Sequence, residues 1–280
     1  MEEFVIKNSK LIPNFLISAV IFISTMSLSG CEFHSVKDLK ETIAKALEDK
    51  YDEEFICYDV WSNGGPSYFG VCSPEKNHDI RFEALFVDTG EIAYEGYYAA
   101  CVAEKIEEDV QKELEDVFND FYLHSYMTVP LYSFNETDIY AENVRNESLE
   151  LDEYIQLESE IRVDPNYKAS LSFVICVNAS AADKTSYEEE YQTLSTIFEE
   201  INEKGINTIV YLKFVPDIVY AKCINYLEEV ANIKSYFDDL VRDYNIKPSN
   251  MTTNIDFEFE GDSPITITQK EYINQREEIN

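Results

Sequence analysis

The sequence predicts an α+β protein, in which a helix plus an antiparallel β-meander module is followed by a small alternating β/α module. Three observations carry this prediction. Apolar residues first recur at helical spacing, then fall in short alternating runs between turn residues, and later fall in strand-like runs that alternate with capped helical ones. Apolar residues make up 45% of the 280 residues, which is enough for a sizeable core.

The first module is expected over residues 31–125, and it opens with a helix. Ser35 and Asp38 form a start signal, and apolar residues follow at helical spacing at Val36, Leu39, Ile43 and Leu47. Four short strands come next, with Asp88-Thr89-Gly90 as the turn between the last two. The strands are expected over residues 54–61, 67–71, 79–87 and 91–97.

A long amphipathic helix is expected to close this module. Its apolar stripe consists of Val102, Ile106, Val110, Leu114, Phe118 and Phe121. His124 would end the helix, where the helix dipole favours a cation. Residues 126–166 are predicted to be a linker with one short helix over 149–157, because proline and asparagines interrupt any regular period.

The second module is expected over residues 167–280. Ser186 with Glu189 predicts a capped helix that ends before Gly205, and Thr268 with Glu271 forms a capping box for a final helix. The other expected elements are strands over 167–177, 208–215 and 252–260 and a helix over 217–244.

The first thirty residues differ from the rest of the chain. Lys7 and Lys10 precede a run over 11–28 that carries no charge, and small residues end this run. These are the parts of a secretory signal. The run is short for a membrane-spanning helix, which needs about 20 apolar residues.

Leu28-Ser29-Gly30-Cys31 resembles the lipobox of bacterial lipoproteins. The resemblance implies that residues 1–30 are a signal peptide, that Leu28, Ser29 and Gly30 form its recognition segment, and that Cys31 carries acyl chains such as palmitate. It also implies a protein anchored by lipid at the extracytoplasmic face of the cell membrane. The alternative is an uncleaved signal anchor that ends in an incidental cysteine. The stretch over 39–121, with its sequence DIRFEALFVDTGEIAYEGY, is also similar to uncharacterised lipoproteins of low-GC Gram-positive bacteria.

The formal net charge of −33 excludes nucleic acid as a partner, because the chain repels phosphates. A direct ligand is therefore expected to be cationic or neutral. Tyr94, Tyr97 and Tyr98 cluster at the end of the fourth expected strand, and beside carboxylates they are candidates for binding a cationic peptide or a sugar. The alternative is that these tyrosines belong to a half-buried strand surface.

Five of the six cysteines lie beyond Cys31, and an odd number cannot all pair within the chain. A turn centred on the glycines at 64 and 65 would place Cys57 opposite Cys72, a geometry that permits a disulfide. Pro66 leaves the strand register open, because proline donates no hydrogen bond to a sheet.

No catalytic residue, cofactor or metal site is predicted. Asp88-Thr89-Gly90 matches one half of an aspartic protease dyad, but the sequence has a single copy, which favours a hairpin turn. The three histidines have no catalytic partner nearby in the sequence; they are His34, His78 and His124. Three carboxylates alternate along the last expected strand, where either a solvated face or a weak calcium site fits; they are Asp256, Glu258 and Glu260.

The leading hypothesis is a lipid-anchored, non-enzymatic protein of the cell envelope that binds an envelope protein or peptide. The alternative is an envelope hydrolase whose site lacks a local motif. Its acid and base would then come from pairs such as Glu83 with Asp88 or Asp256 with Glu258.

Overall fold

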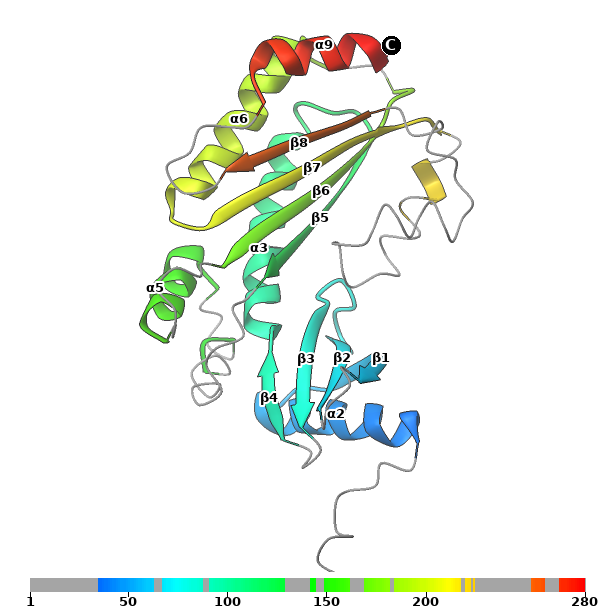
Figure 1. Ribbon diagram of the computed structural model, residues 1–280, viewed down its shortest axis with the longest axis vertical. Helices are drawn as coiled ribbons and strands as arrows, with labels where there is room; N and C mark the ends of the chain where they lie inside the picture. Colours follow the sequence, from blue (N-terminus) through cyan, green and yellow to red (C-terminus); the bar gives the residue numbers. More distant parts are fainter. Residues whose placement is uncertain are drawn as a thin grey trace, which may run out of the picture.

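The computed structural model describes residues 35–62, 67–87, 91–128, 142–144, 149–161, 169–181, 184–217, 220–222, 224, 253–259 and 267–279. Two four-stranded sheets follow one another along the long axis of the molecule, and helix α3 connects them (Figure 1). The predicted α+β class is confirmed, because an antiparallel meander with a helix precedes a sheet that alternates with helices.

The first sheet is an antiparallel meander in the order β1-β2-β3-β4, and α2 packs against it (Figure 1). Its elements are α2 (Val36–Tyr51), β1 (Phe55–Ser62), β2 (Ser67–Pro74), β3 (Phe82–Val87) and β4 (Ile92–Glu95). Ser35 caps α2 as predicted, since its hydroxyl accepts a hydrogen bond from the backbone N–H of Asp38 at 3.1 Å. The helix buries Leu39, Ile43 and Leu47 in the core of this module.

A buried carboxylate ties the first module together. Glu95, at the end of β4, accepts hydrogen bonds from Lys50 Nζ at 2.8 Å and from the hydroxyl of Tyr51 at 2.5 Å. It also accepts one from the backbone N–H of Tyr97 at 2.7 Å. Since a buried charge must be paired and hydrogen-bonded, these contacts fix the end of α2 against the start of the next helix.

Helix α3 (Tyr97–Leu114) and strand β5 (Phe121–Thr128) correct two predictions. Tyr97 begins the helix rather than ending a strand, and Phe121 begins a strand rather than ending the helix. His124 lies in the middle of β5, not at a helix terminus. The physical reason is tertiary: β5 pairs with β6 along its whole length, and its residues alternate between the core and the other face.

The second sheet has the order β5-β6-β7-β8. Strands β6 and β7 are parallel and are joined through α6, whereas β5 and β8 pair antiparallel at the two edges. The other elements of this module are α5 (Leu151–Ile161), β6 (Ser170–Asn178), α6 (Tyr187–Glu203), β7 (Asn207–Val215), β8 (Thr253–Phe259) and α9 (Gln269–Ile279). Most of the helix expected over 217–244 lies outside the described residues.

The predicted cap of α6 and the predicted capping box before α9 are both present. Ser186 and Glu189 exchange hydrogen bonds at the start of α6, and Thr268 and Glu271 do the same before α9. Helix α6 ends before Gly205, whose φ of 100° lies in the left-handed region that favours glycine. Local signals therefore fixed the ends of these helices.

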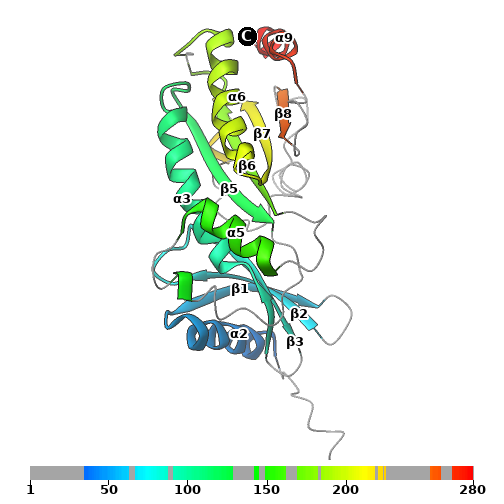
Figure 2. The ribbon, with the colours of Figure 1, turned by 90° about the vertical axis from the view of Figure 1, so that its left-hand side faces the viewer.

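Helix α3 contributes to both hydrophobic cores. Tyr97 and Cys101 pack in the core of the first module, whereas Val102, Val110 and Leu114 pack in the larger core under the second sheet. Figure 2 shows α3 running alongside β5 and reaching down to the first sheet. The boundary predicted at residue 125 falls inside β5.

Candidate functional site

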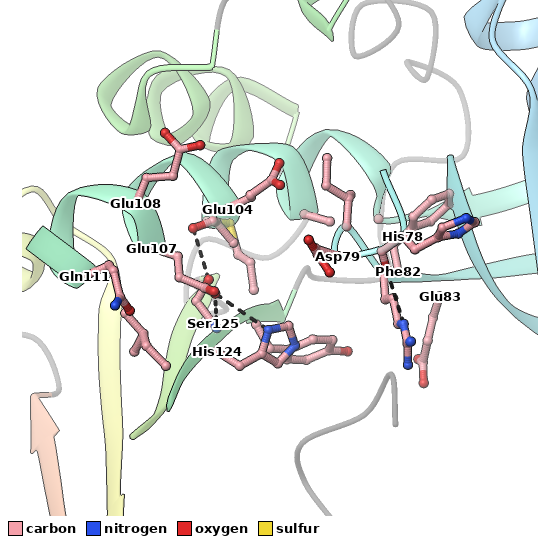
Figure 3. A pocket seen from close by; sticks show the side chains of 18 of the residues that line it. His78, Asp79, Phe82, Glu83, Glu104, Glu107, Glu108, Gln111, His124 and Ser125 are labelled. Atoms are coloured by element: carbon pink, nitrogen blue, oxygen red, sulfur yellow. Dashed lines mark hydrogen bonds and ion pairs between the residues drawn. The ribbon is translucent and has the colours of Figure 1, made fainter. Parts of the chain in front are cut away.

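A pocket of about 460 Å³ lies where the two modules meet. The first module contributes the loop at residues 78–81, part of β3 and the end of β4. The second contributes one face of α3 and the middle of β5 (Figure 3). The long helix was predicted, although with other ends, whereas β5 was not, so the pocket depends on a strand that the sequence did not reveal.

Five acids are among the residues that line the pocket. Glu104, Glu107 and Glu108 project from α3 at spacings of three and four residues, which places side chains on one side of a helix. Asp79 and Glu83 join them from the first module, and Figure 3 shows Asp79 and Glu104 in the part of the pocket nearer His78. The only lysine or arginine among the described lining residues is Arg81.

Glu107 occupies the inner wall of the pocket. Its carboxylate accepts a hydrogen bond from the backbone N–H of Ser125 on β5, and the Ser125 hydroxyl donates to the carbonyl of Ala103 at 3.0 Å. Burial raises the pKa of Glu107 to about 7; the hydrogen bonds from Ser125 oppose this shift, and the charges of Glu104 and Asp79 add to it. Glu107 therefore exchanges a proton near neutral pH.

His124 lies beside Glu107, with 3.6 Å between its Nδ1 and Oε2 of the glutamate (Figure 3). Burial lowers the pKa of His124 to about 4, and the charge of Arg81 lowers it further against a smaller opposing effect of Asp79. At neutral pH the imidazole is therefore uncharged, and the short separation is a contact rather than an ion pair.

Glu104 is the second acid held in a defined position. The side-chain amide of Asn77 donates to its Oε1 at 2.6 Å, which links α3 to the loop after β2. Burial raises the pKa of Glu104, and the hydrogen bond from Asn77 works against this shift. Two partly buried glutamates, one turn apart on α3, thus face the same cavity.

Hydrogen bonds from β1 and β2 hold His78 at the rim of the pocket. The hydroxyl of Tyr58 lies 2.6 Å from His78 Nδ1 and 3.0 Å from the hydroxyl of Ser73. Arg81 donates from Nε to the carbonyl of His78 at 3.3 Å, and its guanidinium lies 5.4 Å from the centre of the Tyr58 ring. Arg81 is therefore directed towards the rim, and its charge still reaches His124 on the inner wall, where it lowers the pKa of the imidazole.

The arrangement is suited to binding a positively charged group. Carboxylates accept hydrogen bonds from ammonium or guanidinium groups, and a partly enclosed site strengthens such charge-assisted bonds. Tyr122 and Tyr126, on β5, add aromatic surface for the apolar part of a ligand. No group of three or more histidines, cysteines and acids in the described part of the chain is placed to hold a metal ion.

The predicted tyrosine face is only partly formed. Tyr94 lines the pocket, but Tyr97 and Tyr98 are buried, at 2% and 1% exposure, because both belong to the first turn of α3 and pack inward. The expectation of an exposed surface made by all three tyrosines is therefore corrected. Tyr94 is the one of the three that lines the pocket.

Several predicted residues lie outside the described part of the structure. They are the lipobox residues Leu28, Ser29, Gly30 and Cys31, together with His34, Asp88 and Glu260. Glu83 lines the pocket, so one member of the expected acid pair Glu83 with Asp88 is at the site. Asp256 and Glu258 are placed on β8 by their pairing with Tyr211 and Ile209, and their side chains are not described.

Sequence reasoning missed the residues that form the inner wall, which are Glu104, Glu107, His124 and Ser125. One signal for β5 was available: Leu123, Ser125 and Met127 alternate with aromatic residues and histidine, a strand period in which these three are buried. Glu107 had no such signal, because an acid in a run of acids on a helix is typical of a solvated face.

Within the described residues, none of the helices is long and apolar enough to cross a membrane.

The profile of DUF5037, a domain of unknown function, matches residues 40–254. The fold is similar to that in the crystal structure of a DUF5037 family protein from Ruminococcus gnavus ATCC 29149, with a TM-score of 0.63 and 17% sequence identity. The similarity covers 85% of this chain and 99% of that one, and at this identity it shows the fold alone. No curated protein matches the sequence.

Proposed function

This chain belongs to the DUF5037 family of domains of unknown function, and from that premise we propose that it is a lipid-anchored envelope protein that binds a cationic ligand. The ligand would be an ammonium-bearing segment of an envelope protein or peptide. The single observation that carries the binding role is the acid-lined pocket between α3, β5 and the loop at 78–81.

The proposed location rests on the lipobox-like segment. Leu28-Ser29-Gly30 precedes Cys31 at the end of the uncharged run, which is where a secretory signal has its small residues and cleavage site. The similar protein from Ruminococcus gnavus comes from a low-GC Gram-positive organism, which agrees with the source expected from the sequence. Two or more acyl chains on Cys31 would hold the protein on the membrane, because one chain alone binds reversibly.

The location is tested by intact-mass measurement of the protein produced in a Gram-positive host. We expect a mass that corresponds to residues 31–280 plus acyl chains, and partitioning into the detergent phase. In the Cys31→Ala variant both should be lost. An uncleaved wild-type chain without lipid would refute the anchor and would leave residues 11–28 as a plain membrane segment.

The proposed ligand class follows from the charges in the pocket. Glu104 and Glu107 face the cavity from successive turns of α3, and Asp79 adds a third carboxylate from the opposite module. The net charge of the whole chain, −33, attracts cations over longer distances and speeds their association. An anionic ligand would be repelled both on its approach to the protein and inside the pocket.

Binding is tested with a short lysine-containing peptide as the probe, followed by calorimetry at low salt. We expect the Glu104→Gln/Glu107→Gln double variant to lose affinity about tenfold or more, because each charge-assisted hydrogen bond is worth roughly 1.5–3 kcal/mol. Glu113→Gln is the matched control, since Glu113 lies on the same helix but does not line the pocket. The same peptide with acetylated lysine should bind weakly. Equal binding by both peptides would refute recognition by charge.

A second candidate is the envelope hydrolase, and one observation favours it. Glu107 has a pKa of about 7 inside a pocket, which suits a general acid or base, and Glu83 offers a second carboxylate. Turnover of peptide or glycoside substrates that disappears in Glu107→Gln, while the fold is retained, would favour catalysis over binding.

A further inference from the structure

Cys57 and Cys72 lie directly opposite each other on neighbouring strands. Strands β1 and β2 are antiparallel, and their register pairs Cys57 with Cys72. Both thiols are buried, at 8% and 0% exposure, and both face the core of the first module. Directly opposite residues of an antiparallel pair have Cα atoms about 4.5–5.5 Å apart, a separation that lies within the range of disulfides.

A β-bulge is what brings the two cysteines into register. From the hairpin end, Ser62 pairs with Tyr68 and the pairing continues without a shift to Asp59 with Val71. Continued further, this register would place Tyr58 opposite Cys72. The register instead shifts between Cys57 and Asp59, so that Tyr58 is the extra residue and Cys57 meets Cys72.

The surroundings leave room for the two sulfur atoms. The nearest residue on β2 that shares this side is Gly70, and a Cβ added there would lie 3.2 Å from Sγ of Cys57 and 3.1 Å from Cδ1 of Ile43. A glycine thus keeps the space beside Cys57 open. The Cys72 thiol donates to Cys57, which lowers the pKa of Cys57 and raises the pKa of Cys72. The positive charge of Lys40 also favours the Cys57 thiolate.

We infer that Cys57 and Cys72 form a disulfide in the mature protein, and that this bond fixes the bulge that holds Tyr58 against His78 at the rim of the pocket. The inference rests on the proposed extracytoplasmic location, because thiols remain reduced in the cytosol. Cys57 and Cys72 are two of the five cysteines beyond Cys31, and Cys101 remains a thiol, because it is buried and burial raises its pKa to about 12.

The bond requires a disulfide-bearing oxidant, such as an envelope thiol oxidase or oxidised glutathione. The Cys57 thiolate attacks one sulfur of the oxidant, and a thiolate leaves as the mixed disulfide forms. Cys72 then gives up its proton and attacks the Cys57 sulfur, which releases the second thiolate of the oxidant. Two thiols are oxidised to one disulfide with the loss of two protons, and the oxidant is reduced to two thiols. Because both sulfurs become buried, this exchange belongs to folding.

The bond would act on the pocket through Tyr58. Tyr58 is the bulged residue next to Cys57, and its hydroxyl reaches both Ser73, the neighbour of Cys72, and His78. A covalent link across the strands at Cys57 and Cys72 therefore fixes both ends of this hydrogen-bonded group. Reduction would leave the bulge held by hydrogen bonds and packing alone.

Two experiments test the inference, the first on the chain from residue 31 onward and the second on the full-length precursor. In the first, protein made in the cytosol is unfolded with reductant and refolded in a glutathione redox buffer. It is then denatured, alkylated and analysed by mass spectrometry. We expect two alkylation sites fewer than in fully reduced protein, and a peptide in which Cys57 is linked to Cys72. The second experiment applies the same alkylation to protein purified from an exporting Gram-positive host, with the same expected result.

The controls separate this inference from the proposed location. Cys101→Ser should keep the linked peptide, whereas Cys57→Ser should lose it and leave Cys72 open to alkylation. The number of alkylated cysteines in the wild-type protein is decisive even if a variant does not fold. Full alkylation of the refolded protein, or a different pairing, would overturn the disulfide whatever the location. The disulfide would also be overturned if all cysteines beyond Cys31 were alkylated in protein whose mass shows cleavage before Cys31 and lipid attachment. An uncleaved, unlipidated chain would refute the location, and the refolded protein would still decide the pair.

Discussion

Oε2 of Glu107 lies 3.6 Å from Nδ1 of His124, and yet the two side chains do not form an ion pair at neutral pH. Burial acts on them in opposite directions: it raises the pKa of the glutamate to about 7 and lowers the pKa of the histidine to about 4. Each shift favours the uncharged form. The inner wall of the pocket can therefore hold a neutral pair, and a cationic ligand would draw Glu107 into its charged form.

Replacement of Glu107 by glutamine should remove a loss of stability that the wild-type protein shows as the pH rises from acidic to neutral. The folded pKa of Glu107 is above its ordinary value of 4.5, so the folded state binds the proton more tightly, and stability falls as the pH rises from 4.5 to about 7. The loss amounts to about 2–3 kcal/mol above that range. Glu107→Gln should remove it, as measured by urea unfolding at about pH 5 and about pH 8. Glu108→Gln, at an exposed position of the same helix, should leave the pH dependence unchanged.

His124 should remain uncharged down to weakly acidic pH. Its folded pKa of about 4 is below the ordinary 6.5, so the unfolded state takes up the proton first, and stability falls as the pH drops through this range. In an NMR titration, the ring C–H signals that disappear in His124→Gln should not shift above about pH 5.5. The same residue in urea should titrate near 6.5. A midpoint near 6.5 in the folded protein would contradict the burial of this imidazole.

Alanine should be tolerated at Gly96 but not at Gly70. A Cβ at Gly70 would lie 3.1 Å from Cδ1 of Ile43 and 3.2 Å from Sγ of Cys57, whereas a Cβ at Gly96 meets nothing closer than 3.6 Å. Overpacking of this kind costs about 1–3 kcal/mol, whereas Gly96→Ala should cost only a few tenths of a kcal/mol, the usual scale of substitutions without a specific conflict. Thermal unfolding under reducing conditions compares the two without a disulfide. Equal destabilisation would show that the space beside Cys57 is not restricted.

The C-terminal helix should depend on one buried ion pair. Arg276 donates to Glu190 from Nε at 2.7 Å, and its guanidinium lies 3.9 Å from the centre of the Phe214 ring. Arg276→Ala leaves a buried glutamate without its guanidinium, a change that costs about 3–5 kcal/mol. Limited proteolysis followed by mass spectrometry should then release α9. The double variant Glu190→Gln/Arg276→Met should resist proteolysis better than Arg276→Ala, and cleavage at equal rates would argue against the ion pair as the main contact.

Sequence reasoning succeeded where structure is decided locally. Ser186 with Glu189 and Thr268 with Glu271 fix helix starts through contacts three residues apart, and these contacts were predicted and are present. A turn centred on the two glycines would also have placed Cys57 opposite Cys72, but Pro66 left that register open, and the bulge that produces the pairing was not predicted.

It failed where tertiary contacts decide between alternatives. Phe118 and Phe121 continue the apolar stripe of α3, so periodicity alone extends the helix through them. The chain instead leaves the helix at Leu114, because β5 gains a full ladder of pairing with β6. The pocket could not be predicted from the sequence for the same reason. It exists only because β5 returns alongside α3 and brings His124 next to Glu107.

Because α3 contributes residues to both hydrophobic cores, it couples the two sheets rigidly and does not act as a hinge between them. Tyr97 anchors its first turn in one core, and Leu114 anchors its last turn in the other. Melting either core removes the support for this helix and therefore weakens the other. The chain should accordingly unfold in a single cooperative transition. A cut at residue 125 would divide β5 and expose the apolar side of α3, so it would not separate two domains that fold independently.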